Sequence, residues 1–236
     1  MTKPIPLKFG VSQTFPCSYL DDQQERLLVA MDDIVFNGAN YEQLLKVGFR
    51  RSGEQVYRPY CVGCQSCESL RIIVNKFKPS RSQKRVLKRN QKFEALLVPN
   101  DTNVKSYFPM YARYIAARHR DGSMYPPDYE QYNNFVKAEW LQVGFLEIYE
   151  QDRLIGVSVL DILPTALSAV YTFFEPEYHQ DSLGTFAILK AVEFAKSLKL
   201  QHVYLGYQID QCNKMNYKSK FTPHERLIDS IWVEQD

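Results

Sequence analysis

The sequence has no long hydrophobic run: no stretch approaches the roughly 18 consecutive apolar residues that a membrane-spanning helix needs. Its first residues, MTKPIPLKFG, also lack the extended apolar segment of a secretory signal. The cysteine content is low, at five residues, and three of these lie together in Cys61-Val-Gly-Cys64-Gln-Ser-Cys67, which does not resemble a disulfide framework. We therefore expect a cytoplasmic protein without a membrane partner.

Further absences exclude other classes of protein. The chain has no internal repeat, no low-complexity tract and no Gly/Ser-rich linker, which excludes a solenoid or a disordered chain. It also lacks a Ser-His-Asp or Cys-His pattern that would demand a covalent intermediate, and Cys17 and Cys212 are more simply read as ordinary buried thiols. With 236 residues and 45% hydrophobic content, the chain has enough apolar material for one large domain or two small ones.

Acidic residues are missing from one segment of the chain. Between Arg71 and Lys92 there are nine Lys/Arg residues and no Asp or Glu, whereas the rest of the chain carries 20 basic against 27 acidic residues. A strongly basic segment on an acidic body indicates a polyanionic partner, because clustered Lys and Arg gain affinity by releasing counterions from a phosphate backbone.

The first half of the chain, which we delimit as residues 1–99, is expected to form a small α+β domain with the cysteine cluster. Apolar spacing predicts a helix over Asp22–Asp33, with Leu27, Leu28, Ala30 and Met31 on its apolar side, and a short helix over Tyr41–Val47 that Gly48 ends. A strand is expected at Leu70–Val74 and another at Phe93–Val98. The helix between these strands begins at a cap formed by Pro79 or Ser80.

The second half, residues 100–236, shows a different order of elements. A helix is expected from residue 100 through Tyr107 to His119, kinked or begun at Pro109. Three strands, a helix and a final strand follow, at 143–149, 154–160, 168–174, 183–198 (capped by Ser182) and 202–205. An antiparallel meander followed by a helix and a strand is the order of GNAT acyltransferases, so the fold class predicted is α+β with a GNAT-like domain.

Several scattered motifs resemble one known family. They are Phe49-Arg-Arg-Ser-Gly53, Tyr57-Arg-Pro-Tyr-Cys61, Pro79-Ser-Arg-Ser-Gln-Lys-Arg85, Arg118-His119, Ser168-Ala-Val-Tyr-Thr-Phe-Phe174, Ser182-Leu-Gly-Thr185, Tyr204-Leu-Gly-Tyr207 and Lys214-Met-Asn-Tyr-Lys218. In this order they resemble the arginyl-tRNA–protein transferase family, and more closely its short bacterial branch. The resemblance implies transfer of leucine from leucyl-tRNA to the N-terminal amine of proteins that begin with Asp or Glu, which marks them for N-degron degradation.

The reaction that the resemblance implies needs no cofactor for transfer. The aminoacyl ester is already activated, and an α-amine with a pKa of about 7.7–8.0 is roughly one-tenth unprotonated near pH 7. Positioning of the amine can therefore supply much of the rate.

The turn that binds coenzyme A in GNAT enzymes is altered in this sequence. GNAT enzymes hold pyrophosphate on a glycine-containing turn at a helix N-terminus. The aligned turn is Asp181-Ser-Leu-Gly184-Thr-Phe186, which places an acidic residue and a bulky ring where the anion would lie. We therefore expect poor binding of coenzyme A.

The basic segment supplies the residues expected to bind tRNA. Lys84, Arg85, Lys88 and Arg89 fall on one face of the helix expected there. The tRNA-binding residues predicted are Arg81, Lys84, Arg85, Lys88 and Arg89. The alternative is a solvated charged face without a partner.

An acidic acceptor side chain requires a cationic group in its pocket. The acceptor-binding candidates are Arg118, His119, Lys214 and Lys218, with Arg50, Arg51 and Arg58 as further alternatives. Any of them could instead pair with the acidic body of the chain.

Three residues at predicted strand ends are candidates for the catalytic site. Tyr171 and Tyr207, with Tyr204 nearby, could orient the amine or the carbonyl, although aromatic residues on strands are commonly core. Asp161 ends the second strand of the meander, where a carboxylate could hold the attacking amine or cap a turn.

The cysteines have spacing compatible with a metal site. Cys61, Cys64 and Cys67, with Cys17 as a fourth thiolate, could hold a structural zinc or an iron–sulfur centre, or could be reduced thiols in a tight turn.

Two functions compete with aminoacyl transfer. A coenzyme A-dependent GNAT N-acetyltransferase fits the second half of the chain but not the Asp181 turn or the basic segment. A non-catalytic RNA-binding module accounts for the charge and leaves the second half without a role.

Overall fold

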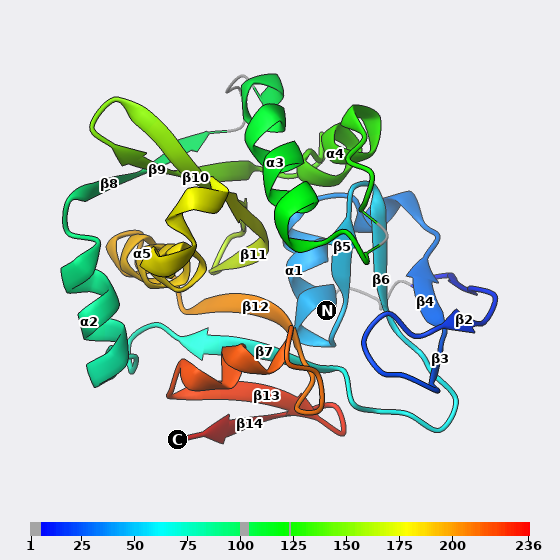
Figure 1. Ribbon diagram of the computed structural model, residues 1–236. Coiled ribbons are helices and arrows are strands. Elements are labelled where there is room, and N and C mark those ends of the chain that lie inside the picture. Colours follow the sequence, from blue (N-terminus) through cyan, green and yellow to red (C-terminus); the bar gives the residue numbers. More distant parts are fainter. Residues whose placement is uncertain (1–5, 100–103, 123) are drawn as a thin grey trace.

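The structure is a computed structural model that describes residues 6–99, 104–122 and 124–236. It has an α+β fold built on one large mixed sheet, with strand order β14-β13-β7-β12-β11-β10-β9-β8, and a smaller sheet of order β1-β4-β6-β5 (Figure 1). A short hairpin pairs β2 with β3. The α+β class expected from the sequence is confirmed.

The centre of the large sheet contains the predicted meander. β9 (Val143–Glu150), β10 (Arg153–Ile162) and β11 (Ala166–Phe174) are antiparallel neighbours, and after α5 (Leu183–Ser197) the strand β12 (His202–Gln208) returns parallel to β11. Runs rich in Val, Ile, Leu and Phe that are buried on both faces explain why these segments form inner strands. The GNAT-like order of meander, helix and strand is therefore present.

Two strands of this sheet come from the first 99 residues. β7 (Glu68–Ile73) lies between β12 and β13, and β8 (Phe93–Pro99) forms the edge beside β9. The large sheet therefore contains strands from both sides of residue 99, and the division into two domains at this residue stays a prediction.

The basic helix lies in the connection between β7 and β8. α2 (Arg81–Arg89) begins at Ser80, whose hydroxyl accepts from the Gln83 amide while the Gln83 side chain accepts from the Ser80 amide. This capping box satisfies two main-chain groups at the helix start. The helix predicted from the Pro79-Ser80 cap is confirmed.

The smaller sheet replaces one of the predicted helices. The segment Asp22–Asp33 does not form a helix: it contains β3 (Gln24–Glu25), β4 (Leu27–Ala30) and the start of a 3-10 turn at Asp33–Val35. β4 pairs with β1 (Phe9–Val11) on one side and with β6 (Gln55–Pro59) on the other. Pairing with distant strands therefore outweighs the local helix preference of this segment.

The other predicted elements of the first half are confirmed. α1 (Gly38–Lys46) covers the helix expected at Tyr41–Val47, and Gly48 follows it with φ +90°, a conformation that favours glycine. β5 (Arg50–Ser52) then pairs with β6.

The remaining elements complete both sides of the sheet. They are β2 (Phe15–Pro16), η2 (Val104–Tyr107), α3 (Phe108–Arg118), α4 (Tyr129–Val136), η3 (Pro176–Asp181), η4 (Asn216–Lys220), β13 (His224–Ile228) and β14 (Ile231–Gln235). Pro109 lies in the first turn of α3, as expected from its missing N–H. Across residues 6–99, 104–122 and 124–236, no helix is both long and apolar enough to cross a membrane.

Helices and the smaller sheet cover the two faces of the large sheet. α5 packs on β9 to β12 with α2 against it, whereas α3, α4 and the smaller sheet lie on the opposite side (Figure 1). The hydrophobic core is continuous across the sheet and its two covers.

Candidate functional site

The site begins where the two parallel strands of the sheet separate. β11 and β12 pair over three residues each, 166–168 with 202–204. Beyond these residues, β11 continues beside β10, and β12 continues beside β7 after an irregularity between Tyr204 and Gly206. Residues 169–174 and 205–208 are therefore not paired with each other, and we call this separation of the two strands the opening. It is the kind of topological break where α/β proteins bind ligands.

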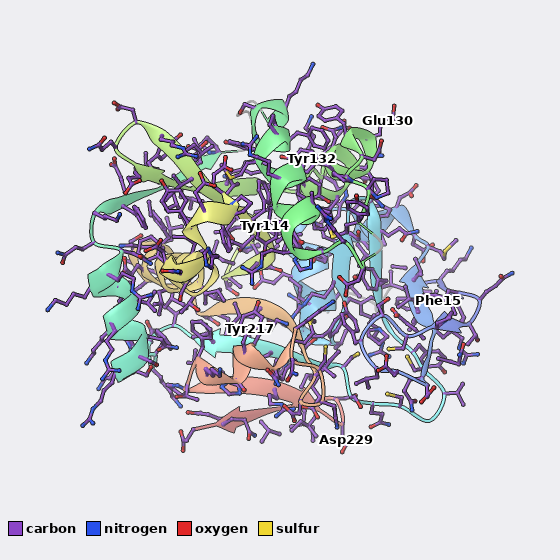
Figure 2. The ribbon with its side chains drawn as sticks, viewed as in Figure 1. Phe15, Tyr114, Glu130, Tyr132, Tyr217 and Asp229 are labelled. Atoms are coloured by element: carbon purple, nitrogen blue, oxygen red, sulfur yellow. The ribbon has the colours of Figure 1, made fainter. Side chains whose placement is uncertain are left out.

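A cluster of aromatic side chains surrounds Tyr171, on the β11 side of this opening. Tyr171 on β11 has its ring 6.4 Å from that of Tyr114 on α3 and 5.4 Å from that of Phe135. Burial raises the pKa of Tyr171, and the neighbouring Tyr114 and Tyr111 raise it further. Figure 2 shows Tyr114 on α3 and Tyr217 on the segment that follows β12. The predicted residue Tyr171 therefore lies among rings that could hold a planar or apolar group.

Three of the four predicted acceptor-binding residues meet at the rim of this aromatic cluster. The Arg118 guanidinium lies 5.8 Å from the centroid of the Tyr114 ring, and the His119 ring is 5.4 Å from the same ring. Lys214 forms an exposed ion pair of 2.7 Å with Asp121. Burial, then the charges of Lys214 and Arg118, lower the pKa of His119, so this imidazole is neutral at physiological pH.

Lys218, the fourth acceptor-binding candidate, lies inside the protein. Its side chain is 4% exposed, and its Nζ donates 2.7 Å to the main-chain oxygen of Tyr207. The Tyr207 hydroxyl in turn donates 2.8 Å to the carbonyl oxygen of Gly48. Tyr207 therefore fixes the end of β12 to the first half of the chain, and Lys218 bonds η4 to the same strand.

Asp161 is not exposed to the opening. Its carboxylate is fully buried, and Oδ1 accepts from Arg51 Nη2 at 2.6 Å and from Arg51 Nε at 2.8 Å. The carboxylate that we predicted to hold the attacking amine is therefore enclosed by the protein and paired with Arg51. The sequence does not show this pairing, because the two residues lie 110 positions apart. Asp161 lies beneath the site and positions β5 against β10.

The basic helix forms an exposed surface beside the N-terminus of α5. Lys84, Arg85 and Lys88 are exposed on α2, and among the described residues none of them has an ion-pair partner. Arg89 donates 2.5 Å to the main-chain oxygen of Gln180, just before the α5 N-terminus. The basic face is therefore exposed and joined to the second half of the chain, and its binding of tRNA stays a prediction.

The turn before α5 has an irregular backbone and is bonded to the basic helix. Ser182 has a left-handed conformation with φ 56°, and its side chain makes no capping bond. Asn90 at the end of α2 donates 2.8 Å to the Asp181 carbonyl oxygen. A hydrogen bond thus joins the end of the basic helix to the turn before α5.

The four cysteines suggested as metal ligands lie around one small cavity. Cys17, Cys61, Cys64 and Cys67 line a space of about 30 Å³, together with Tyr207 and other residues. Burial, followed by the charges of the other three thiols, raises the pKa of Cys67 to about 12, so its thiol is protonated as the cavity stands. Within the described residues no group of three or more side chains is arranged to hold a metal ion. The suggested zinc or iron–sulfur site is therefore unsupported.

The antiparallel meander β9-β10-β11, the helix α5 and the parallel strand β12 define a GNAT-like α+β fold. Models of the family described as arginine-tRNA-protein transferase match the chain over residues 15–85 for its N terminus and 106–228 for its C terminus. The chain belongs to this arginine-tRNA-protein transferase family.

Curated relatives refine the comparison. The chain is 51% identical over 226 residues to the aspartate/glutamate leucyltransferase of Pseudoalteromonas atlantica, covering 96% of each chain. It is 48% identical over 236 residues to the enzyme of the same name from Aeromonas hydrophila, covering 100% of this chain and 98% of the relative. Among solved structures it is similar to a tandem GNAT protein of clavulanic acid biosynthesis, with 12% identity, a TM-score of 0.45 and coverage of 71% and 53%.

Proposed function

We propose that this protein transfers leucine from leucyl-tRNA to the N-terminal α-amine of proteins that begin with Asp or Glu, and so marks them for N-degron degradation in the cytoplasm. The observation that carries the proposal is the near-complete alignment with aspartate/glutamate leucyltransferases at 48–51% identity. The exposed basic helix and the aromatic opening between β11 and β12 supply the surfaces that such a reaction needs.

The chemistry is aminolysis of an ester. The α-amine attacks the leucyl carbonyl carbon, a C–N bond forms, the C–O bond to the tRNA 3′ end breaks, and the leaving oxygen takes up a proton as the amine loses one. No cofactor is required, because the ester carries the activation, and the protein contributes positioning and stabilisation of the oxyanion.

Binding of tRNA is assigned to the exposed face of α2. Arg81, Lys84, Arg85 and Lys88 contact phosphates, and Arg89 links the helix to the segment before α5. Such contacts orient the nucleic acid without reading its sequence. From α2, the 3′ end of the tRNA would pass the N-terminus of α5 and reach Tyr171 in the opening.

The opening between β11 and β12 is assigned to the reacting groups. Tyr171 packs against the acyl-adenosine end, Tyr207 fixes the β12 backbone, and Asp161 positions the site through Arg51. Arg118 supplies a positive charge at the rim that would attract an acidic N-terminus, beside the neutral His119 and the ion pair of Lys214 with Asp121.

A transfer assay tests the proposal. Radiolabelled leucyl-tRNA is incubated with four peptides that differ only in a first residue of Asp, Glu, Arg or Lys, and arginyl-tRNA is supplied as the alternative donor. We expect label on the Asp and Glu peptides from leucyl-tRNA. Label on the Arg and Lys peptides instead, or on none, would contradict the proposal.

The coenzyme A-dependent alternative is tested separately by calorimetry. Asp181 and Phe186 replace the residues that hold pyrophosphate in coenzyme A enzymes, so we expect acetyl-coenzyme A to give no heat of binding. A protein concentration of about 100 µM is high enough to detect micromolar affinity. Clear micromolar binding would favour an acetyltransferase.

A further inference from the structure

One buried arginine lacks the partners that a buried charge needs. Arg50 on β5 is 6% exposed, and its Nε and Nη2 have no hydrogen-bond partner among the described residues. Its Nη1 donates 3.2 Å to the carbonyl oxygen of the preceding residue, Phe49. Because an unpaired buried guanidinium is costly, two unused donors on one edge indicate a site that a ligand completes.

Arg50 lies against the strand that borders the opening. Its guanidinium carbon is 5.1 Å from the ring centroid of Tyr204 and 5.7 Å from that of Tyr207, both on β12. The Tyr207 ring also lines the cavity next to the smaller sheet. The two unused nitrogens therefore lie at the interface between the smaller sheet and β12, on the side of the sheet opposite α5.

The charges around Arg50 leave it without a counter-ion of its own. The adjacent Arg51 takes both hydrogen bonds that Asp161 accepts, and Lys218 is bonded to main-chain oxygen. Arg50 and Arg51 thus both lie near the buried Asp161, and only Arg51 is bonded to it. Glu25 lines the neighbouring cavity, and its carboxylate accepts a bond of 3.3 Å from a main-chain N–H. An additional anion would be stabilised at Arg50.

The unused atoms have the geometry for a carboxylate. Nε and Nη2 form the edge of the guanidinium that binds both oxygens of a carboxylate side by side. Arg113 shows this arrangement in the same chain, where Nε and Nη2 donate to the two oxygens of Glu175 at 2.9 and 2.6 Å. An amide presents an NH₂ group to one of these donors and leaves it unpaired.

We infer that Arg50 binds the side-chain carboxylate of the acceptor's first residue and thereby selects Asp and Glu. This inference rests on the proposed function and names the residue that reads the acceptor. It places the acidic side chain against the smaller sheet, with the α-amine directed toward the opening between β11 and β12.

The test compares acids with their amides. Peptides that begin with Asp, Asn, Glu or Gln are assayed as leucine acceptors with the wild type and with Arg50→Gln. We expect the wild type to prefer Glu over Gln by 100-fold or more in kcat/KM, since a site built for a hydrogen-bonded group rejects the analogue that lacks it. In Arg50→Gln this ratio should fall to about threefold or less, chiefly through a higher KM for Asp and Glu, with leucyl-tRNA affinity changed by less than about twofold. A ratio that stays near the wild-type value would overturn the inference.

Folding controls accompany the assay. Because Arg50 makes no side-chain ion pair in the described structure, Arg50→Gln should melt at or above the wild-type temperature, whereas a structural arginine would lower it. Arg153→Gln, which removes the same charge from an exposed ion pair, should keep the acid preference. If Arg50→Gln does not fold, Arg50→Lys decides: it should keep the direction of the Glu-over-Gln preference while reducing it at least tenfold, and an unreduced preference would overturn the inference.

Direct binding separates this inference from the proposed function. Calorimetry with Asp and Asn peptides, in the presence of uncharged tRNA, should show Asp bound at least tenfold tighter by the wild type and equally by Arg50→Gln. This result without any leucyl transfer would defeat the proposed function and keep the acid-binding role of Arg50. Equal binding of both peptides by the wild type would defeat that role.

Discussion

Arg51 and Asp161 join the two sheets of the protein through an ion pair in which both side chains are fully buried. Arg51 lies on β5 and Asp161 on β10, and the remaining Arg51 nitrogen, Nη1, donates to the carbonyl oxygens of Phe135 and Lys137 at the end of α4. One guanidinium therefore holds three elements beneath the proposed site.

Breaking this pair should destabilise the protein strongly. Asp161→Asn leaves the Arg51 guanidinium buried without its carboxylate, and we expect the free energy of unfolding to fall by about 3–5 kcal/mol. Urea denaturation at pH 7 measures the change. A double variant, Arg51→Met with Asp161→Leu, should recover more than half of the loss; if it is less stable than Asp161→Asn, the pair has a role beyond charge compensation.

The basic helix should determine how tRNA binding depends on salt. Replacing Lys84, Arg85 and Lys88 with alanine removes up to three phosphate contacts, so the slope of log K against log salt should become shallower by about 2–3. Affinity is measured between 50 and 200 mM salt, roughly the range in which such effects are large. The matched control replaces the exposed residues Lys105, Lys196 and Lys199 with alanine; a slope that changes equally in both variants would argue against a specific docking surface.

Tyr171 should contribute to transfer through its ring. Tyr171→Ala removes the group that packs against Tyr114 and Phe135 in the opening, and we expect kcat/KM for leucyl transfer to fall at least tenfold, about 1.4 kcal/mol or more of transition-state stabilisation. Tyr60→Ala, at an exposed tyrosine in the first half, serves as the control. Activity within twofold of the wild type in Tyr171→Ala would remove this residue from the site.

Lys218 should make stability depend on pH in a defined window. Burial lowers the pKa of Lys218 to about 8, from an ordinary value of 10.5. Between these values the unfolded chain binds more protons at this residue than the native protein, so its contribution to the free energy of unfolding rises with pH. The difference between the wild type and Lys218→Met, measured by urea denaturation at pH 7, 8.5 and 10, should therefore shift in favour of the wild type across this window. A difference that is constant with pH would show that the pKa of Lys218 is unperturbed.

Much of the fold was predictable because its signals are local. Apolar strands at 143–149 and 154–160 and the Ser80 cap depend on neighbouring residues, and the structure contains each of them. The helix predicted at Asp22–Asp33 was wrong because the competing interaction, pairing of β4 with β1 and β6, is set by residues far away in the sequence. No local pattern reports that competition.

The site divides in the same way. The aromatic ends of β11 and β12 and the basic face of α2 could be placed from periodicity and the resemblance to a known family. The partners of buried charges could not be predicted from the sequence. Asp161 was expected to hold the amine because its pairing with Arg51, which joins one sheet to the other, has no local signal. The contrast between Arg50 and Arg51, adjacent in sequence and opposite in pairing, is visible only in three dimensions.

The position of β7 in the large sheet has a consequence for how the chain is made. β7 is complete once residue 73 has been synthesised, yet both of its neighbours, β12 and β13, lie after residue 201. During translation both edges of this segment therefore stay unpaired until more than half of the chain has been synthesised. Unpaired strand edges can pair with other nascent chains. Truncation after β12 would leave one edge of β7 unpaired permanently. Pairing of β13 with β7 therefore protects the edge of a segment that was synthesised early.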